Sequence, residues 1–261
     1  MGEAMLRSLF GKGLTTADQA TVAETSPARR EYLTQRYRIA CTEQGHDAVA
    51  GAETVVFAVK PQNLAAVLGD LRRILKPEQL VLSIVAGASL HTLTQGLEHP
   101  AVVRVMPNTP AQIGAGISVW TATSQVSEAQ KAVAQSILSA LGKEIYVAEE
   151  HYLDMATALS GSGPAYVFLF IEALIDAGVH IGLPREMAER LVQQTVVGSA
   201  QFAIESGKHP AELRNMVTSP GGTTTEGLRW LEEGALRAMI TQAVAAAYEK
   251  SLALGKPASH E

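Results

Sequence analysis

The hydrophobic pattern changes near residue 147, and this change constrains the fold more than any other feature. Before it, short β-branched runs alternate with helical stretches such as Leu64–Leu75 and Glu128–Leu141. The expected strands are Thr21–Ala23, Ile39–Cys41, Thr54–Val59, Leu80–Val85, Ala101–Met106, Gly116–Thr121 and Lys143–Val147. Such alternation predicts a doubly wound α/β domain with a largely parallel sheet.

From Glu149 onward the chain carries helical patterns and no convincing strand. Prolines at positions 164, 184 and 210 mark helix starts, because proline suits the first turn of a helix. We therefore predict an α/β chain with two domains. Residues 1–147 form a Rossmann-like doubly wound N-terminal domain, and residues 148–261 form an all-α C-terminal domain.

Composition narrows the class of protein. With 47% hydrophobic and 18% charged residues, a net charge of −5 and a pI near 5.8, the chain reads as globular and not as a nucleic-acid or anionic-membrane binder. The single Cys41 permits no intramolecular disulfide and favours a reducing, cytoplasmic compartment. The apolar run at 165–171 is followed by Glu172 and Asp176, which indicates a buried helix and no membrane span. The histidines lack metal-ligand spacing, so no metal site is expected.

The segment from Ser219 to Thr225 offers four hydroxyls around Gly221-Gly222. The apolar spacing after it predicts a helix beginning near Thr223, so free N–H groups and the positive end of the helix dipole would meet there. This turn suits a bound carboxylate or phosphate. The alternative is an ordinary capped loop with Thr223 or Thr224 as the N-cap.

Four blocks, in order, resemble the pyrroline-5-carboxylate reductase family, and the resemblance covers nearly the whole chain: Ala58-Val59-Lys60-Pro61, Arg104–Pro110, Leu159–Tyr166 and Val217–Glu233. The resemblance implies NAD(P)H-dependent reduction of 1-pyrroline-5-carboxylate to L-proline, the last step of proline biosynthesis. It also implies that the helical domain binds substrate and dimerises, with five dimers in a ring as a family association.

The resemblance assigns substrate binding to the turn, at Ser219, Gly222, Thr223 and Thr224. The Ser219 hydroxyl and backbone N–H groups near Gly222 would hold the carboxylate, and the Thr224 hydroxyl, the catalytic group, would orient the ring nitrogen. No lysine lies between Lys143 and Lys208. A ketone reductase needs an acid for the alkoxide that forms, whereas an imine is protonated before hydride arrives, so this absence favours C=N reduction.

We expect the cofactor, NADPH or NADH, at Gly2 and at residues at or just after the ends of expected strands: Ser26, Arg29, Ala58, Val59, Lys60, Pro61, Ala86, Gly87 and Asn108. Small Ala86 and Gly87 would admit the flat nicotinamide ring. Glu24 suits the ribose hydroxyl of NAD, while Ser26 and Arg29 suit the 2′-phosphate of NADP, and we lean towards NADP.

The resemblance implies that Gly2 is the last glycine of a G-x-G-x-x-G motif, so the first strand and the first two glycines are absent ahead of it. We expect a start codon assigned too far downstream or a truncated chain; the alternative is that the protein itself lacks this strand and these glycines. Two alternatives stay open. The chain could reduce another cyclic imine or a keto acid with NAD(P)H, or it could be an inactive truncated subunit that only forms oligomers.

Overall fold

The structure is a computed structural model that describes residues 1–255. The end of the predicted helical domain, residues 256–261, lies outside the described residues. Seven strands are present in the described part: β1 (Thr21–Ala23), β2 (Ala40–Thr42), β3 (Thr54–Phe57), β4 (Leu80–Ser83), β5 (Val102–Met106), β6 (Gly116–Ala122) and β7 (Gly142–Tyr146). Each overlaps a predicted strand, so the α/β fold class is confirmed.

The strands form two sheets. The larger sheet has five strands in the order β3-β4-β5-β6-β7. The β5–β6 pair is antiparallel and the other pairs are parallel, so β6 and β7 both run opposite to β3, β4 and β5. β1 and β2 pair with each other in a separate parallel sheet. In a doubly wound order a further strand would lie between β1 and β3, and the division falls at this place. The β1–β2 pair is poorly buried, since the residues of both strands are exposed or half-exposed.

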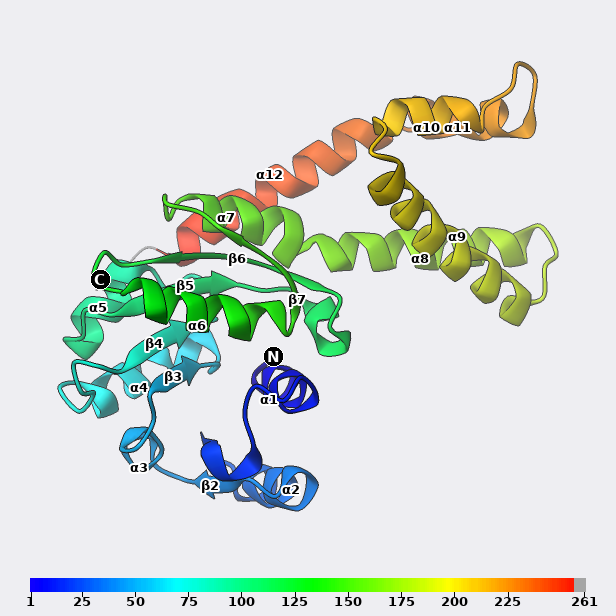
Figure 1. The fold of residues 1–261 in the computed structure, drawn as a ribbon. Helices are drawn as coiled ribbons and strands as arrows, with labels where there is room; N and C mark the ends of the chain where they lie inside the picture. The colour runs from blue at the N-terminus through cyan, green and yellow to red at the C-terminus, as the bar shows by residue number, and fades with distance from the viewer. Residues whose placement is uncertain (256–261) are drawn as a thin grey trace. The chain divides into compact units, whose positions relative to one another are not determined.

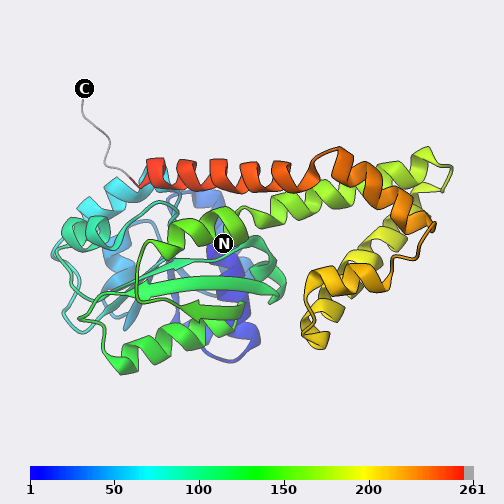
Figure 2. The same cartoon turned by 90° about the horizontal axis from the view of Figure 1, so that it is seen from above.

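Helices cover both faces of the five-stranded sheet (Figures 1 and 2). One core is formed with α1 (Gly2–Gly11) and α6 (Glu128–Ser139), through Met5, Ala134 and Leu138 packed on Val103 and Val105. The opposite core is formed with the helices α3 (Gly45–Val49), α4 (Leu64–Leu71) and α5 (Leu90–Leu97). Helix α2 (Pro27–Tyr37) packs on β2, and α7 (Tyr152–Ala156) contacts β5 and β6.

Residues 163–246 form a second compact unit, and residues 1–162 with 247–261 form the first. The helices that follow α7 are α8 (Gly163–His180), α9 (Arg185–Ser206), α10 (Pro210–Met216), α11 (Thr223–Glu233) and α12 (Leu236–Leu254). The predicted helix starts hold, because Pro184 is the N-cap of α9 and Pro210 opens α10. The predicted domain boundary at residue 147 stays a prediction.

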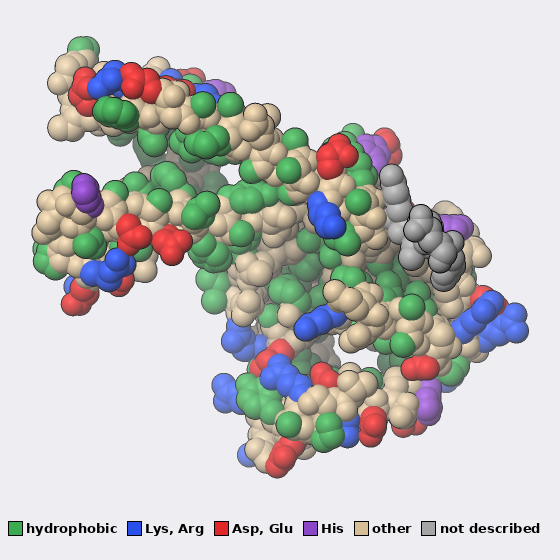
Figure 3. Space-filling view, turned by 180° about the vertical axis from the view of Figure 1, so that it is seen from behind, with side chains coloured by type: hydrophobic (Ala, Val, Ile, Leu, Met, Phe, Trp, Pro, Cys, Tyr) green, Lys and Arg blue, Asp and Glu red, His purple; other side chains and the backbone are tan. Residues whose placement is uncertain are grey.

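Helix α8 is not the buried helix that its sequence indicated. Phe168 and Leu169 are 60% and 66% exposed, and Ile175 is the residue of α8 that is buried. The stretch Tyr152–His180 has the length and apolar composition of a membrane-crossing helix, although composition alone is weak evidence for one. Hydrophobic side chains also lie on the surface of the other C-terminal helices, among them α9, α11 and α12 (Figure 3). The monomer therefore leaves a large apolar surface uncovered.

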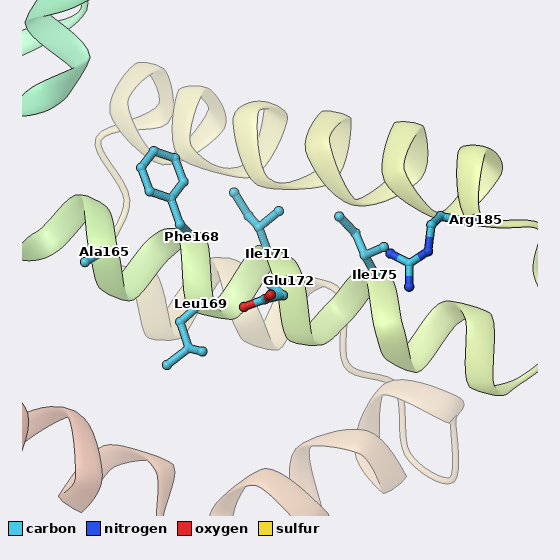
Figure 4. A pocket seen from close by; sticks show the side chains of 7 residues that line it. All are labelled: Ala165, Phe168, Leu169, Ile171, Glu172, Ile175 and Arg185. Atoms are coloured by element: carbon cyan, nitrogen blue, oxygen red, sulfur yellow. The ribbon is translucent and has the colours of Figure 1, made fainter.

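This surface includes an open groove of about 570 Å³ beside α8. Figure 4 shows Phe168 and Ile171 pointing to one side of the helix and Leu169 to the opposite side. Apolar side chains that point in both directions cannot all be covered by one neighbouring helix. A single stripe of apolar side chains along α8 could have been buried against one other helix of the same chain.

Candidate active site

Three loops with predicted cofactor residues meet at one edge of the five-stranded sheet. β3, β4 and β5 are parallel, and Ser83 pairs with Phe57 on one side and with Arg104 on the other. Their carboxyl ends therefore lie next to each other. The loops that leave these ends carry Ala58–Pro61, Ala86-Gly87 and Asn108, so the structure brings these residues together at the edge where doubly wound proteins bind ligands.

The N-terminus of α1 lies at the same edge. A Cβ added at Gly2 would come within 3.0 Å of the Ala58 Cβ, so the backbone here approaches the end of β3 closely. The N–H groups of Gly2, Glu3 and Ala4 have no acceptor among the described residues. Free N–H groups at a helix N-terminus, with no side chain on Gly2, fit a dinucleotide pyrophosphate.

Lys60 is the exposed cation of this edge. It follows β3 as the N-cap of the short 3₁₀ helix Pro61–Asn63, and its side chain has no partner among the described residues. The predicted loop Ala58–Pro61 therefore presents its lysine to solvent at the sheet edge. This free ammonium could contact an anionic ligand.

Gly87 and Asn108 also have structural tasks at this edge. Gly87 has φ +76°, and a Cβ there would lie 3.2 Å from the Leu254 Cβ at the end of α12. Both features require glycine independently of a nicotinamide ring. The Asn108 Oδ1 accepts a hydrogen bond of 2.9 Å from the Ile117 N–H. This bond fixes the side-chain amide, whose Nδ2 group is left for a ligand.

The loop after β1 carries Ser26 and Arg29, at the carboxyl end of the two-stranded sheet. Ser26 is the N-cap of α2, and its N–H donates to the Glu24 Oε1 over 2.9 Å. Glu24 is therefore turned into its own loop. Arg29 is 40% exposed and pairs through Nη2 with Glu3 in the first turn of α1. Sequence reasoning did not find Glu3 as a neighbour of Arg29.

A cluster of charged residues around the buried Arg104 lies beside this edge, and the sequence analysis did not predict it. Arg104 on β5 has a side chain only 7% exposed and donates to the Glu150 Oε1 over 2.7 Å and to the Asp154 Oδ1 over 3.1 Å. Ser251 near the end of α12 donates to the same Asp154 oxygen. The signal was a single arginine in the apolar strand V-V-R-V-M, since a buried cation needs anionic partners. In the described part of the chain no group of His, Cys, Asp and Glu could hold a metal.

The predicted helix entry near Ser160 has an unusual form. Residues Thr157–Gly161 make a π-helical turn before α8, and the Ser160 hydroxyl donates to the Ala156 carbonyl over 3.0 Å. A Cβ at Gly161 would lie 2.5 Å from the Met106 Cε, at the end of β5. Glycine at this position lets the turn pack directly on the last residue of a strand that leads into the Asn108 loop.

The hydroxyl-rich turn before α11 is shaped by its two glycines. Gly221 has φ +70°, a backbone conformation that L side chains rarely adopt. Gly222 is the N-cap of α11, and a Cβ there would meet the Ser219 Oγ at 2.5 Å. The predicted helix start at Thr223 is confirmed. The alternative of a threonine as N-cap is wrong, because Gly222 occupies that position and no side chain caps the helix.

The polar groups of this turn fall into two sets. The Thr225 hydroxyl donates to the Ser219 carbonyl over 2.7 Å, and the Gly222 N–H donates to the same carbonyl over 3.0 Å. These two donors hold the turn, so the Gly222 N–H is not free for a substrate. In contrast, the hydroxyls of Ser219, Thr223 and Thr224 and the N–H groups of Thr223 and Thr224 have no partner among residues 1–255. This second set could bind a carboxylate.

Two family patterns match the chain. Residues 150–254 match the family described as pyrroline-5-carboxylate reductase dimerisation. Residues 1–87 match the family described as NADP oxidoreductase, coenzyme F420-dependent. The first match contains α8 with its exposed apolar residues, and the second contains α1, Arg29 and the loop after β3.

Relatives match over nearly the full length. A pyrroline-5-carboxylate reductase of Synechocystis is 43% identical over 98% of this chain and 95% of the relative. A solved structure of a pyrroline-5-carboxylate reductase from Coxiella burnetii superposes with a TM-score of 0.89 at 35% identity, and covers 98% of this chain and 95% of the other. A pyrroline carboxylate reductase from Plasmodium falciparum, solved with NADP bound, also gives a TM-score of 0.89, at 32% identity and with the same coverage.

Proposed function

The chain belongs to the pyrroline-5-carboxylate reductase family, and from this premise we propose that the turn from Ser219 to Thr224 binds the substrate carboxylate. The protein catalyses the NAD(P)H-dependent reduction of 1-pyrroline-5-carboxylate to L-proline, the last step of proline biosynthesis. NADP(H) serves as its cofactor. The observation that carries the proposal is the set of unpaired donors at the start of α11.

The carboxylate is held by the N–H groups of Thr223 and Thr224 together with the Ser219 hydroxyl. These N–H groups lie at the positive end of α11, where a negative charge is favoured by roughly 0.3–1 kcal/mol at an exposed site. A bound carboxylate supplies the acceptors that these donors lack among residues 1–255. The Gly222 N–H, which the sequence predicted as a further donor to the carboxylate, instead fixes the turn.

The Thr224 hydroxyl orients the pyrroline ring. It has no partner among the described residues, so it is available to hydrogen-bond the ring nitrogen. The cofactor, when bound, supplies a hydride to the ring carbon C5. The imine nitrogen carries a proton before that step, so the C=N electrons move to nitrogen and a neutral amine results. Thr224 therefore contributes by positioning the ring, and a hydroxyl of ordinary acidity is sufficient.

The predicted cofactor residues of the first compact unit keep their proposed roles. The first turn of α1 at Gly2 receives the pyrophosphate, and the loops with Ala58, Val59, Lys60 and Pro61, with Ala86 and Gly87, and with Asn108 line the remainder of the cofactor. Ser26 and Arg29 receive the 2′-phosphate. The location of three of these loops at one sheet edge supports this proposal. Residues 1–147 and 148–261 remain our proposed domains.

The protein self-associates through the region of residues 150–254. We propose a dimer, with a ring of five dimers as the larger assembly, in which the exposed apolar residues of α8 are covered by the partner. The exposure of Phe168 and Leu169 supports this, because soluble monomers rarely leave such surfaces uncovered. A cytoplasmic location agrees with the single unpaired Cys41.

Substitution of the two unpaired hydroxyls tests the substrate site. Thr224→Ala keeps the backbone donors and removes only the group proposed to hold the ring nitrogen, so kcat/KM for pyrroline-5-carboxylate should fall by about 10- to 100-fold. Ser219→Ala should raise KM more than it lowers kcat, because it weakens the hold on the carboxylate in both ground and transition states.

Two further measurements complete this test. Binding of NADPH and dimerisation should be unchanged in both variants. Thr195→Ala on α9 is the matched control, because its hydroxyl donates to the Leu191 carbonyl of its own helix, and its kinetics should remain close to those of the unmodified enzyme. Unaltered kinetics for Thr224→Ala and Ser219→Ala would show that the turn only caps α11.

A further inference from the structure

Glu3 in the first turn of α1 gathers three side chains of α2. Its Oε1 accepts hydrogen bonds from the Tyr37 hydroxyl over 2.8 Å and the Tyr32 hydroxyl over 3.2 Å, and its Oε2 pairs with Arg29. The pKa of Glu3 lies below its ordinary value, mainly because of the hydrogen bond from the Tyr37 hydroxyl and to a lesser extent because of Arg29. Burial acts in the opposite direction. A carboxylate is thus held ionised beside the helix N-terminus and the guanidinium that the cofactor phosphates would approach.

Two side chains contact the Arg29 guanidinium: Glu3 at one edge and the Tyr32 ring on one face. Its Nη2 contacts Glu3, and its central carbon lies 4.7 Å from the centre of the Tyr32 ring. Its Nε and Nη1 groups make no hydrogen bond to the described residues. Because Arg29 lies in the first turn of α2, near the N-cap Ser26, these remaining donors are at the carboxyl end of β1.

The neighbouring Arg30 does not have this freedom. Its Nη1 donates to the carbonyl oxygens of Glu24 and Thr25, over 2.6 and 2.9 Å, and its Nη2 reaches Glu43. Arg30 therefore fixes the loop itself. Among the described residues, Arg29 keeps both Nη1 and Nε without a hydrogen bond, whereas both terminal nitrogens of Arg30 are engaged. Arg29 is therefore the better placed of the two for an anionic ligand, and Glu3 is the acidic residue that pairs with it.

We propose that Glu3 sets the preference between NADPH and NADH by sharing Arg29 with the 2′-phosphate. This inference rests on the proposed role of Arg29 as a contact of that phosphate. The carboxylate neutralises much of the guanidinium charge and repels a phosphate bound beside it, so it limits the gain that the 2′-phosphate brings. NADH lacks this phosphate, and the effect of Glu3 on NADH is confined to the pyrophosphate that both cofactors share.

The test is the ratio of dissociation constants for NADH and NADPH, measured by calorimetric titration of the full chain. Glu3→Gln keeps the side-chain size and an oxygen for the tyrosine hydroxyls but removes the charge. The preference for NADPH should rise by about three- to tenfold at low salt and by less at high salt, because the repulsion is screened. Effects common to both cofactors cancel in the ratio.

A double-mutant cycle separates this proposal from the proposed function. In an Arg29→Ala background, Glu3→Gln should change the ratio much less, because the shared cation is gone and only the direct repulsion between the carboxylate and the phosphate remains. If Arg29→Ala lowers the NADPH preference while Glu3→Gln has no effect, the role of Glu3 is wrong and that of Arg29 stands. If Arg29→Ala itself leaves the ratio unchanged, both assignments fail. An equal effect of Glu3→Gln in the two backgrounds would also overturn the role of Glu3.

Two control variants guard against a purely structural effect. Glu43→Gln removes a carboxylate that pairs with Arg30, and the cofactor ratio should stay constant. Tyr37→Phe removes a hydrogen bond to Glu3 without changing its charge, so it should lower thermal stability and leave the ratio unchanged. A shift of the ratio in Tyr37→Phe as large as that in Glu3→Gln would mean that packing of α1 on α2, and not charge, decides the preference.

Discussion

Gly222 lies so close to Ser219 that a Cβ at position 222 would be 2.5 Å from the Ser219 Oγ. The same two residues are joined by the hydrogen bond from the Gly222 N–H to the Ser219 carbonyl. The absence of a side chain at position 222 therefore keeps the Ser219 hydroxyl beside the free N–H groups of α11. The substrate site proposed above depends on this close approach.

Gly222→Ala should displace the Ser219 hydroxyl and weaken carboxylate binding. We expect KM for pyrroline-5-carboxylate to rise about tenfold or more, the equivalent of one lost hydrogen bond to a charged group. Gly227→Ala is the matched control, since a Cβ there meets nothing within 4 Å and alanine favours a helix. Steady-state kinetics check both. A similar KM for the two variants would contradict the role of the turn.

The stability of the chain should depend on the ionisation of Glu3. Its pKa in the folded chain is lowered from 4.5, first by the Tyr37 hydroxyl and then by Arg29, so the unfolded chain binds more protons in this range. Its stabilisation is complete above pH 4.5 and is lost as the pH falls through the lowered pKa. The difference in melting temperature between the unmodified chain and Glu3→Gln should therefore shrink as the pH falls from 6 to 3.5. A difference that is constant across this range would disprove the linkage.

Removing Arg104 should destabilise the first compact unit strongly. Arg104→Met leaves the carboxylates of Glu150 and Asp154 without their buried cation, and we expect a loss of about 3–5 kcal/mol in the free energy of unfolding. Urea denaturation measures it. Arg237→Met is the control, because Arg237 is 67% exposed and its pair with Glu232 lies in solvent, so little change is expected. Equal stability of the two variants would be inconsistent with a buried cluster.

β1 and β3 do not pair with each other, and this gap between the two sheets leads to a prediction about NADPH affinity. A short apolar strand ending in G-x-G, added ahead of Met1, would enter between the two sheets and lead into α1 at Gly2. We expect NADPH affinity to rise at least about tenfold, about 1.4 kcal/mol. An extension of equal length with a polar, proline-containing sequence is the control. Equal affinities of the two extended chains would count against a dinucleotide motif at Gly2.

Local patterns in the sequence determined the elements and the family. Short β-branched runs predicted each strand, as in Thr54–Val59, and the prolines at 184 and 210 predicted helix starts that the structure confirms. Four short blocks in the sequence indicated the family, to which full-length relatives show that the chain belongs. Such features depend on residues close in sequence, so their physical basis is visible in the chain itself.

Tertiary structure decided which groups are free and which are already paired. The sequence showed four hydroxyls in the turn, but only the fold shows that Thr225 is bonded to the Ser219 carbonyl while Thr224 is unpaired. The sequence also indicated Arg29 as a phosphate contact but did not reveal its pairing with Glu3. Glu3 lies 26 residues away in the chain and contacts Arg29 only because α1 packs beside α2. The exposed faces of α8 are a further example. The apolar pattern of a helix predicts that its surface is covered, but it does not tell whether the covering element belongs to the same chain or to a second chain. Pairing between distant residues depends on the arrangement of whole elements, and no local pattern encodes it.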